Sequence, residues 1–359
     1  MPYSVEELLQ RHAAFWKREK VDRPLITVRP YAPLAHRRLP LADGTATEGD
    51  IELKPEMIDP ELINNVEQRR AASGQLNLGG SFSARGAYER IPWVEAILGC
   101  PIWADSHSGS IWSEAYLEGV RAPRRFDLGP ANLWFARLKA AVQSLVANDD
   151  DSYLVAHTLM RGPIDMVRAL AGDVAMCLAA LDDPEGTRQL LEEVTPLFIK
   201  IGQAQTELIP PYHGGYCSQF GVWAPGTVVR TQCDMSSVTS AKTYADLFLP
   251  YDERICRAFD YSVIHLHSGF LHTVDAILEH EYPMAIEIAL DTGSTPVTTR
   301  DVVPVAQKIL ARKPLLLEGP MSAVDLAYVL ANLPAAGLYV CAYVPEEELA
   351  AARKLVGEA

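Results

Sequence analysis

Two histidines separated by one residue are the feature of this sequence that most clearly suggests chemistry. His265 and His267 occur in the segment SVIHLHSG (residues 262–269), where the β-branched Val263 and Ile264 indicate a buried strand. Side chains two residues apart on a strand point to the same side, so both imidazoles would leave one strand end together. Because histidine is the commonest metal ligand, the spacing predicts part of a metal site. The alternative is one hydrogen-bonded core histidine and one histidine in a loop.

Cys341 is the expected third metal ligand. It lies in LYVCAYV (residues 338–344), which we expect to be the last strand of the fold. A thiolate and two imidazoles form a zinc-like set with one coordination position open for a substrate. Glu318, in LLLEGP, is the first candidate for a fourth ligand or for a carboxylate beside the metal, and Glu287 is the second. The competing interpretation of Cys341 is a small buried hydrophobic residue.

The elements that must position these residues alternate between strand and helix. The second half repeats near-continuous apolar strands followed by amphipathic helices, a pattern typical of buried parallel strands. Strands are expected near residues 25, 102, 153, 214, 262, 285, 314 and 338. Eight such units predict an α/β fold of the (β/α)8 barrel (TIM barrel) type, with an open doubly wound sheet as the alternative. No G-x-G-x-x-G fingerprint opens the first unit, which argues against a dinucleotide-binding fold.

The 359 residues are enough for one large barrel. Residues 1–21 contain a capped amphipathic helix, which predicts an N-terminal helical cap on a single barrel domain of residues 22–359. Residues 31–60 are rich in proline and charge and have no periodicity. That composition predicts a long loop over the mouth of the barrel.

Polar residues gather where the predicted strands end. Barrel active sites lie at the C-terminal ends of the strands, and an unpaired ionisable group there would cost several kcal/mol, so some of these residues should bind a ligand. The candidates for substrate binding are Arg29, Asp105, His107, Gln219 and Trp223. The candidates for a catalytic role are Glu318, Asp234 and His157.

Composition excludes several classes of partner. A formal net charge of -14 and the lack of a Lys/Arg run argue against binding to nucleic acid or to an anionic membrane. Six scattered cysteines without a Cys-x-x-Cys pair fit a reducing compartment rather than a disulfide framework. The N-terminus lacks an apolar signal core, and no apolar run reaches membrane-spanning length. We therefore expect a cytoplasmic protein that acts on a small molecule.

Four segments resemble the uroporphyrinogen decarboxylase superfamily: SYLVAHTLMRGPIDMVRALAG, CDMSS followed by TYADLFLPYDERI, VIHLHSG, and the terminal YVCAYVPEEELAAA. The resemblance covers residues 90 to the end and implies a barrel fold. In the corrinoid-linked methyltransferase branch, a His-x-Cys pair and a late cysteine hold zinc. His265 and Cys341 match two of these ligands, and His267 stands where a cysteine is usual. The decarboxylase branch matches less well, because its paired-arginine signature is absent around Arg29, Arg37 and Arg38.

The resemblance implies a zinc-dependent methyltransferase acting on a small methylated substrate or a thiol acceptor. The corrinoid would arrive on a separate protein, since the sequence has no Asp-x-His-x-x-Gly cobalamin motif. Two alternatives remain open at this point: a metal-free decarboxylase or lyase of a polycarboxylate, and a barrel that binds a ligand without catalysis. A homodimer is one assembly state compatible with the sequence.

Overall fold

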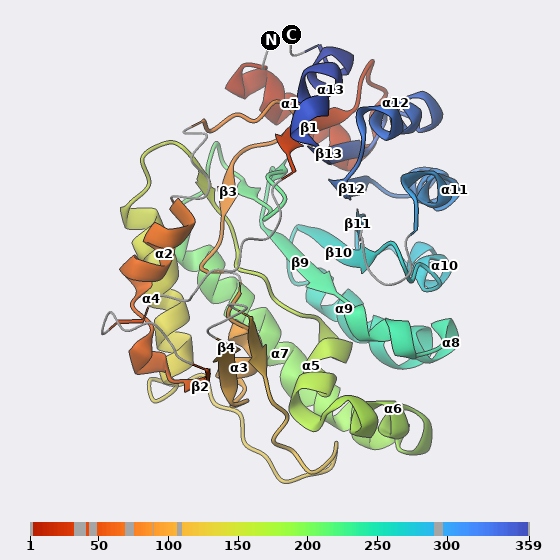
Figure 1. Ribbon diagram of the computed structural model, residues 1–359. Helices are drawn as coiled ribbons and strands as arrows, with labels where there is room; N and C mark the ends of the chain where they lie inside the picture. The colour runs from red at the N-terminus through yellow and green to blue at the C-terminus, as the bar shows by residue number, and fades with distance from the viewer. Residues whose placement is uncertain are drawn as a thin grey trace.

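The centre of the fold is a curved sheet of six parallel strands. A computed structural model describes residues 3–31, 41–42, 49–68, 75–88, 90–105, 110–290 and 297–357. The sheet has the order β1-β13-β12-β11-β10-β9. Its strands are β1 (Leu25–Pro30), β13 (Leu338–Val344), β12 (Leu315–Pro320), β11 (Ala285–Ala289), β10 (Tyr261–His267) and β9 (Val228–Gln232). Figure 1 shows them as an arc with helices on its outer side.

One face of this sheet is mostly apolar because it packs against helices, and its buried Thr231 donates a hydrogen bond to Asp252 of the helix side. Outward side chains such as Val28, Ile264, Ile286 and Leu317 belong to one hydrophobic cluster that extends from Ile26 to Val356. The helices that follow the sheet strands are α8 (Ala241–Thr243), α9 (Leu249–Cys256), α10 (Val274–Leu278), α11 (Thr299–Leu310), α12 (Ala323–Asn332) and α13 (Leu349–Leu355). The short helices η2 (Asp234–Val238), η3 (Tyr244–Phe248, a π-helix) and η4 (Glu346–Glu348) lie between them.

The other face changes character along the strands. Near their N-terminal ends, its side chains form a second apolar cluster that includes Val263, Ala285, Leu316 and Tyr339. Helix α1 (Val5–Lys17) covers this end of the sheet with Leu8, Phe15 and Trp16. Towards the C-terminal ends the same face becomes polar, with Thr27, Arg29, Arg230, Gln232, His265, His267, Glu287, Glu318, Cys341 and Tyr343 at alternate positions of their strands. Polar groups are therefore concentrated at the end of the sheet opposite α1.

Two shorter strands lie between the edges of the six-stranded sheet. β3 (Ala84–Arg85) and β6 (Leu154–Val155) pair in parallel with each other. Glycines allow close contact with the edges, since a Cβ at Gly80 would lie 2.2 Å from the Ile26 nitrogen and one at Gly162 would lie 2.1 Å from the Gln232 carbonyl. Among the described residues, six strands form one hydrogen-bonded sheet, and β3 and β6 form a separate pair. The strands therefore do not form a continuous hydrogen-bonded ring.

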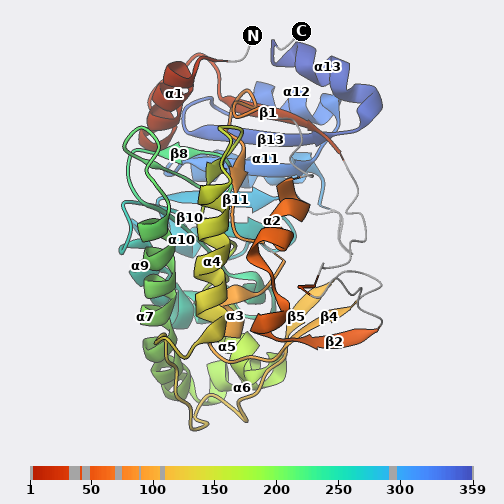
Figure 2. The same ribbon diagram turned by 90° about the vertical axis from the view of Figure 1, so that its left-hand side faces the viewer.

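Two of the eight expected strands were assigned to the wrong segments. β4 (Ile102–Asp105) belongs to an antiparallel sheet with β2 (Asp50–Leu53) and β5 (Ile111–Ser113), which lies apart from β1 and β13 in Figure 2. The segment near residue 214 forms a hairpin of β7 (Tyr216–Cys217) and β8 (Trp223–Ala224), and the sheet strand is the following β9. Short apolar segments look alike in sequence, and only their pairing partners distinguish them.

The first half supplies the other helices. They are η1 (Pro55–Met57), α2 (Pro60–Gln68), α3 (Trp93–Ile97), α4 (Leu133–Ala147), α5 (Pro163–Ala171), α6 (Asp173–Asp182) and α7 (Pro184–Leu208). Helices α5 and α6 are separated at Gly172, whose φ is 91°. Much of the expected loop over residues 31–60 lies outside the described residues, and its described part includes β2 and η1.

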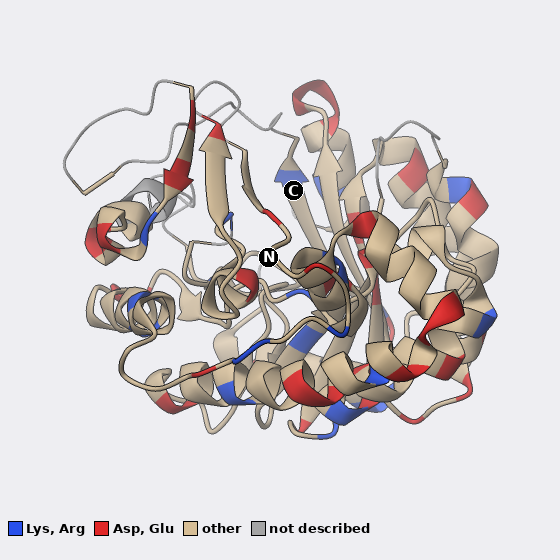
Figure 3. Cartoon of the chain, turned by 90° about the horizontal axis from the view of Figure 1, so that it is seen from below, with Lys and Arg blue, Asp and Glu red and all other residues tan. Residues whose placement is uncertain are grey.

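None of the helices in the described part of the chain combines the length and the apolar content needed to span a membrane. In the view of Figure 3, the lysines and arginines are spread among acidic residues over the outer helices.

His12 ties α1 to the sheet and should make the stability of the fold depend on pH. Its Nδ1 accepts the Trp223 N–H at 2.9 Å, so Nε2 carries the proton donated to the Gly80 carbonyl at 3.0 Å. Burial lowers the pKa of His12 to about 4. The unfolded chain therefore binds more protons below the ordinary pKa of 6.5, and the contribution of His12 to stability is lost as the pH falls from there towards 4.

We predict that the free energy of unfolding falls as the pH decreases from 6.5 to 4 and that His12→Gln removes about 3 kcal/mol of this fall. The energy follows from the difference between the pKa of about 4 in the folded chain and the ordinary value of 6.5. Urea denaturation at several pH values measures the difference between the variant and the wild type. The exposed His272→Gln is the control and should retain the wild-type slope. Equal pH dependence in wild type and His12→Gln would contradict the assignment.

Candidate metal centre

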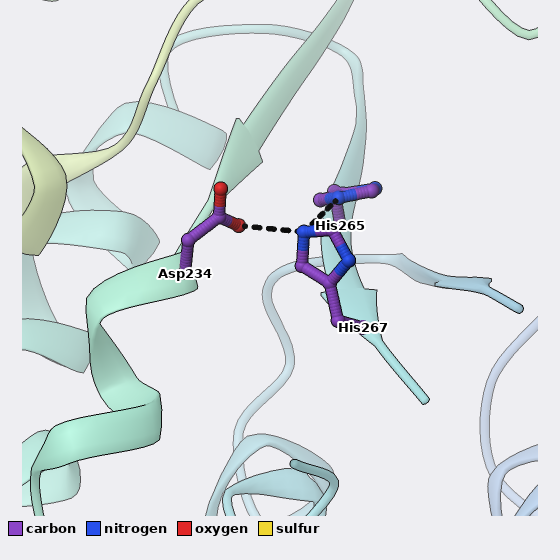
Figure 4. A group of neighbouring side chains, drawn as sticks. All are labelled: Asp234, His265 and His267. Atoms are coloured by element: carbon purple, nitrogen blue, oxygen red, sulfur yellow. Dashed lines mark hydrogen bonds and ion pairs between the residues drawn. The ribbon is translucent and has the colours of Figure 1, made fainter. Parts of the chain in front are cut away.

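Three metal-ligating side chains converge beside the C-terminal end of β10. His265 and His267 project from β10 on the same side, and Asp234 lies at the start of η2, directly after the turn that follows β9. One ligand atom from each residue lies within 4.8 Å of the others. Figure 4 shows the two imidazoles and the carboxylate directed towards one another. The two histidines are thus brought together as the His-x-His spacing predicts.

Two of the three separations between these atoms are those of ligands on a single cation, and all three are within 4.8 Å. The Nε2 atoms of His265 and His267 are 3.2 Å apart, and His267 Nε2 is 3.4 Å from Asp234 Oδ1. In a tetrahedral zinc site with bonds of about 2.0–2.1 Å, neighbouring ligand atoms are about 3.3 Å apart. Asp234 Oδ1 is also buried without a hydrogen bond in the described part of the chain. Two nitrogens and one oxygen at these separations form a donor set that suits zinc.

Glu287 fixes the orientation of His265. This carboxylate is almost fully buried on β11, directly beside His265 in the sheet register, and one of its oxygens accepts a hydrogen bond from His265 Nδ1. With the proton on Nδ1, the lone pair of His265 Nε2 faces His267 and Asp234. A carboxylate behind a ligating histidine sets the tautomer and raises the basicity of the ligand. Glu287 therefore lies behind the first ligand rather than among the ligands.

Asp234 is held by hydrogen bonds from both sides. Gln232 Nε2 donates to Asp234 Oδ2 at 2.8 Å, and Arg230 in turn donates to Gln232 Oε1. The buried Asp165 of α5 accepts the backbone N–H groups of Asp234 at 3.2 Å and of Met235 at 2.9 Å. Burial alone would raise the pKa of Asp234, but the neighbouring His267 imidazole and the nearby positive charges lower it below its usual range. The carboxylate is consequently ionised at neutral pH, as a metal ligand must be.

Cys341 does not belong to this group of ligands. In the sheet register its neighbours are Thr27 and Glu318, and β13 lies three strands from β10, about 14 Å along the sheet at about 4.8 Å per strand. Burial and the charge of Glu318 raise the pKa of the Cys341 thiol to about 12, so it is protonated at neutral pH. Asp234 takes the position that the sequence assigned to this cysteine.

Glu318 also lies away from the histidines. It accepts a hydrogen bond from Tyr343 Oη at 2.5 Å, and Arg29 lies close enough to interact with both by charge. Arg29, Glu318, Cys341 and Tyr343 therefore form a second polar cluster on the same face of the sheet, which we call the β1–β13 cluster.

The other predicted site residues lie elsewhere. His157 contacts α7, where its Nε2 is 2.8 Å from Thr206 Oγ1, and burial lowers its pKa to about 4. Trp223 packs under α1 at the opposite end of the sheet, and Gln219 lies in the loop of the same hairpin. Asp105 ends β4 in the antiparallel sheet, and His107 lies outside the described residues. The placements of Trp223, Gln219 and Asp105 follow from the changed strand assignments, because their segments lie outside the six-stranded sheet.

Two features of the site were missed in the sequence. Asp234 was expected to have a catalytic role and not to be a metal ligand, although an aspartate two residues after the end of a buried strand is well placed to ligate. Asp165 is not among the predicted site residues, because it lies in the first turn of a helix, where an acidic residue is common for local reasons. Its contact with η2 depends on how α5 packs, which the sequence does not reveal.

Comparisons with known proteins do not assign this chain to a family. The chain matches no protein-family model, and it matches no curated protein sequence. Among solved structures it is similar to the homocysteine methyltransferase MmuM from Escherichia coli in its metallated form, with 13% identity over 94% of this chain and 97% of that chain, and a TM-score of 0.36. A similarity at that level carries no argument about the function of this chain.

We predict that the purified protein binds one zinc ion per chain and that His265→Ala and Asp234→Asn each lose it. Removing one of three ligands leaves too few donors to hold the metal. Elemental analysis after dialysis against excess zinc measures the stoichiometry. His280→Ala, outside the group, is the control. Cys341→Ser should retain the metal, and loss of zinc from Cys341→Ser with retention in Asp234→Asn would favour the cysteine-containing ligand set instead.

Glu287→Gln should weaken zinc binding by about 10–100-fold without abolishing it. The neutral amide would no longer hold the proton of His265 on Nδ1, and it would no longer raise the basicity of this ligand with a negative charge. Competition with a chromogenic chelator measures the dissociation constant. Glu253→Gln, which removes a carboxylate beside the surface residue His280, is the matched control. An unchanged affinity in Glu287→Gln would show that this carboxylate has no influence on the ligand.

Proposed function

We propose that this protein is a zinc-dependent methyltransferase that acts on a small methylated substrate or thiol acceptor together with a corrinoid carried by a separate protein. The observation that carries the proposal is the convergence of His265, His267 and Asp234 at the polar end of the sheet. The proposal also uses the resemblance of the sequence around His265 to the corrinoid-linked methyltransferases. A (β/α)8 barrel that closes through β3 and β6 is part of the same proposal.

The three side chains supply three donors and leave a fourth coordination position for the substrate. A zinc ion held there would act as a Lewis acid that lowers the pKa of a bound thiol, and so provide a thiolate near neutral pH. One carboxylate and two neutral imidazoles leave the ion with a net charge of plus one. A centre with two thiolate ligands would have no net charge. The ligand set found here therefore favours acidification of a bound thiol more strongly.

The protein groups around the centre hold its ligands in place. Glu287 keeps the proton of His265 on Nδ1, and Gln232 and Asp165 fix the carboxylate of Asp234 and its backbone. About one quarter of the His267 side chain remains exposed, so a small molecule from solvent can reach this edge of the group. A ligand set that is already ordered needs little rearrangement when a substrate binds.

A second candidate function is metal-assisted hydrolysis, because two histidines and a carboxylate are also the zinc ligands of several hydrolases. In that case the open position would hold a water molecule, and the metal would lower the pKa of that water. The two candidates share the metal centre and differ in the substrate that occupies its open position.

The test compares both reactions on the zinc-loaded protein. With methylcobalamin in place of the corrinoid protein and mercaptoethanol as acceptor, the wild type should accelerate formation of the methyl thioether. Asp234→Asn should lower that rate by at least about a hundredfold, since Lewis-acid stabilisation is worth several kcal/mol. His280→Ala should leave it unchanged.

The same preparations are assayed with p-nitrophenyl acetate. Ester hydrolysis that depends on Asp234, without methyl transfer to any thiol tested, would replace the methyltransferase proposal with the hydrolase. Activity in Asp234→Asn equal to wild type in both assays would remove the metal centre from the chemistry.

A further inference from the structure

Helix α6 (Asp173–Asp182) is apolar on every side, although only one side packs on the protein. Between its terminal aspartates the sequence is VAMCLAAL (174–181), which has no charged, hydroxyl or amide side chain. The inner side packs on α5 and α7, and its Met176 and Ala180 are buried. A helix that is hydrophobic all round is normally buried on all sides. The outer side of α6 therefore has the composition of a covered surface.

Val174, Leu178 and Leu181 form a stripe along the outer side, which we call the α6 stripe. Their spacing places them on one face of the helix. They are 72%, 55% and 71% exposed, and Val174 and Leu181 are the most exposed large apolar residues in the described part of the chain. Single exposed apolar residues are common, but a contiguous apolar patch marks an interaction surface. In Figure 1, α6 lies at the outer edge of the molecule, beyond α5.

We propose that the α6 stripe binds the α6 stripe of a second copy of this chain, with the two helices antiparallel about a twofold axis. In such an interface the same patch must be complementary to itself. The stripe meets this condition because its midpoint falls between Cys177 and Leu178. A twofold axis at that point places Val174 of each copy against Leu181 of the other, and every position of the stripe then faces an apolar residue.

The charges at the ends of α6 suit this arrangement. At about 100° per residue, Asp173 and Asp182 point to opposite sides of the helix. In the antiparallel pair, Asp173 of one copy and Asp182 of the other share an end but lie on opposite sides of the contact, so these like charges do not face each other. Arg168 also forms an ion pair with Asp173 at 2.6 Å. The antiparallel direction places opposite ends of the two helix dipoles side by side.

The charge of the chain disfavours other occupants of this surface. The α6 stripe has no charge of its own that would select a charged protein partner. The formal net charge of -14 and the two aspartates beside the stripe oppose contact with an anionic membrane. A second copy presents an uncharged apolar stripe of equal length and therefore matches the surface in both respects.

The size of the surface predicts a weak dimer. The 10 residues of α6 form a helix about 15 Å long and about 10 Å wide. That footprint is well below the roughly 800 Å² that each partner buries in a standard stable interface. The apolar surface continues past the start of the helix, where Ala115 lies beside Gly172 and Tyr116 is 41% exposed. We therefore expect a dissociation constant on the order of 10–100 µM.

Sedimentation velocity of the full chain, from about 1 to 500 µM, brackets this dissociation constant. We expect the weight-average sedimentation coefficient to rise from the monomer value towards the dimer value. Leu178→Glu places a carboxylate beside the twofold axis, where it faces its own copy, and should weaken the dimer at least about tenfold. Val324→Glu is the matched control, because Val324 is a similarly exposed apolar residue on α12. It should sediment as wild type does.

Cys177 provides a test of the position of the axis. All six cysteines lie in the described part of the chain, and Cys177 is the one that is not buried. Because it lies beside the proposed axis, a short bismaleimide should join the Cys177 thiols of the two copies. Each thiol adds across one maleimide double bond, so the reaction needs no oxidant. We expect covalent dimer in wild type, none in Cys177→Ser and less in Leu178→Glu.

The direction of the helices is tested in the Cys177→Ser background. A mixture of Val174→Cys and Leu181→Cys chains should give more covalent dimer than Val174→Cys alone, because the antiparallel pairing brings these two positions together. A higher yield from Val174→Cys alone would overturn the antiparallel arrangement.

Two results would overturn the interface itself: a monomer at every concentration of the wild type, or a dimer that Leu178→Glu leaves unchanged. The dimer should form equally in the presence of zinc and of a chelator, because α6 contributes no metal ligand. Its formation is therefore measured independently of the proposed function.

Discussion

The alternation of side chains along six parallel strands is the constraint on which the rest of the structure depends. One set of positions is used mainly by apolar residues that pack against the helices, so all the ionisable side chains on the inner strand positions named above take the other set. Helix α1 closes the N-terminal end of that second face with Leu8, Phe15 and Trp16. Ionisable groups are consequently concentrated at the C-terminal end, where their neighbours on adjacent strands are also polar.

A chain of hydrogen bonds follows from that crowding. It runs from Glu287 to His265 and on to His267, continues through the ion-pair contact of His267 with Asp234, and reaches Arg230 through Gln232. Each of these side chains thereby gains a polar neighbour. Only the Nε2 atoms of the two histidines and Asp234 Oδ1 face a common point. A cation at that point would be bound by the two imidazole nitrogens and the Asp234 carboxylate.

The polar face has two walls with different chemistry. Nitrogen and oxygen ligands lie on β10 and η2, and an arginine with a carboxylate and a phenol lies on β1, β12 and β13. Helix packing fixes both walls, since the strands that carry them are rigid and buried.

The pattern of the sequence alone indicated much of this arrangement. Apolar strand segments near residues 25, 262, 285, 314 and 338 are parallel neighbours in the sheet, and the His-x-His spacing brings His265 and His267 together because two residues on a strand always share a side. Such local periodicities need no knowledge of distant contacts. The choice between Asp234 and Cys341 does need it, because the order of strands decides which ends are neighbours. Strand pairing likewise decided that residues 102–105 and the hairpin near residue 214 lie outside the central sheet. The packing of α5 decided that Asp165 reaches Asp234. Hydrogen bonds between remote segments form only when the tertiary structure brings these segments together.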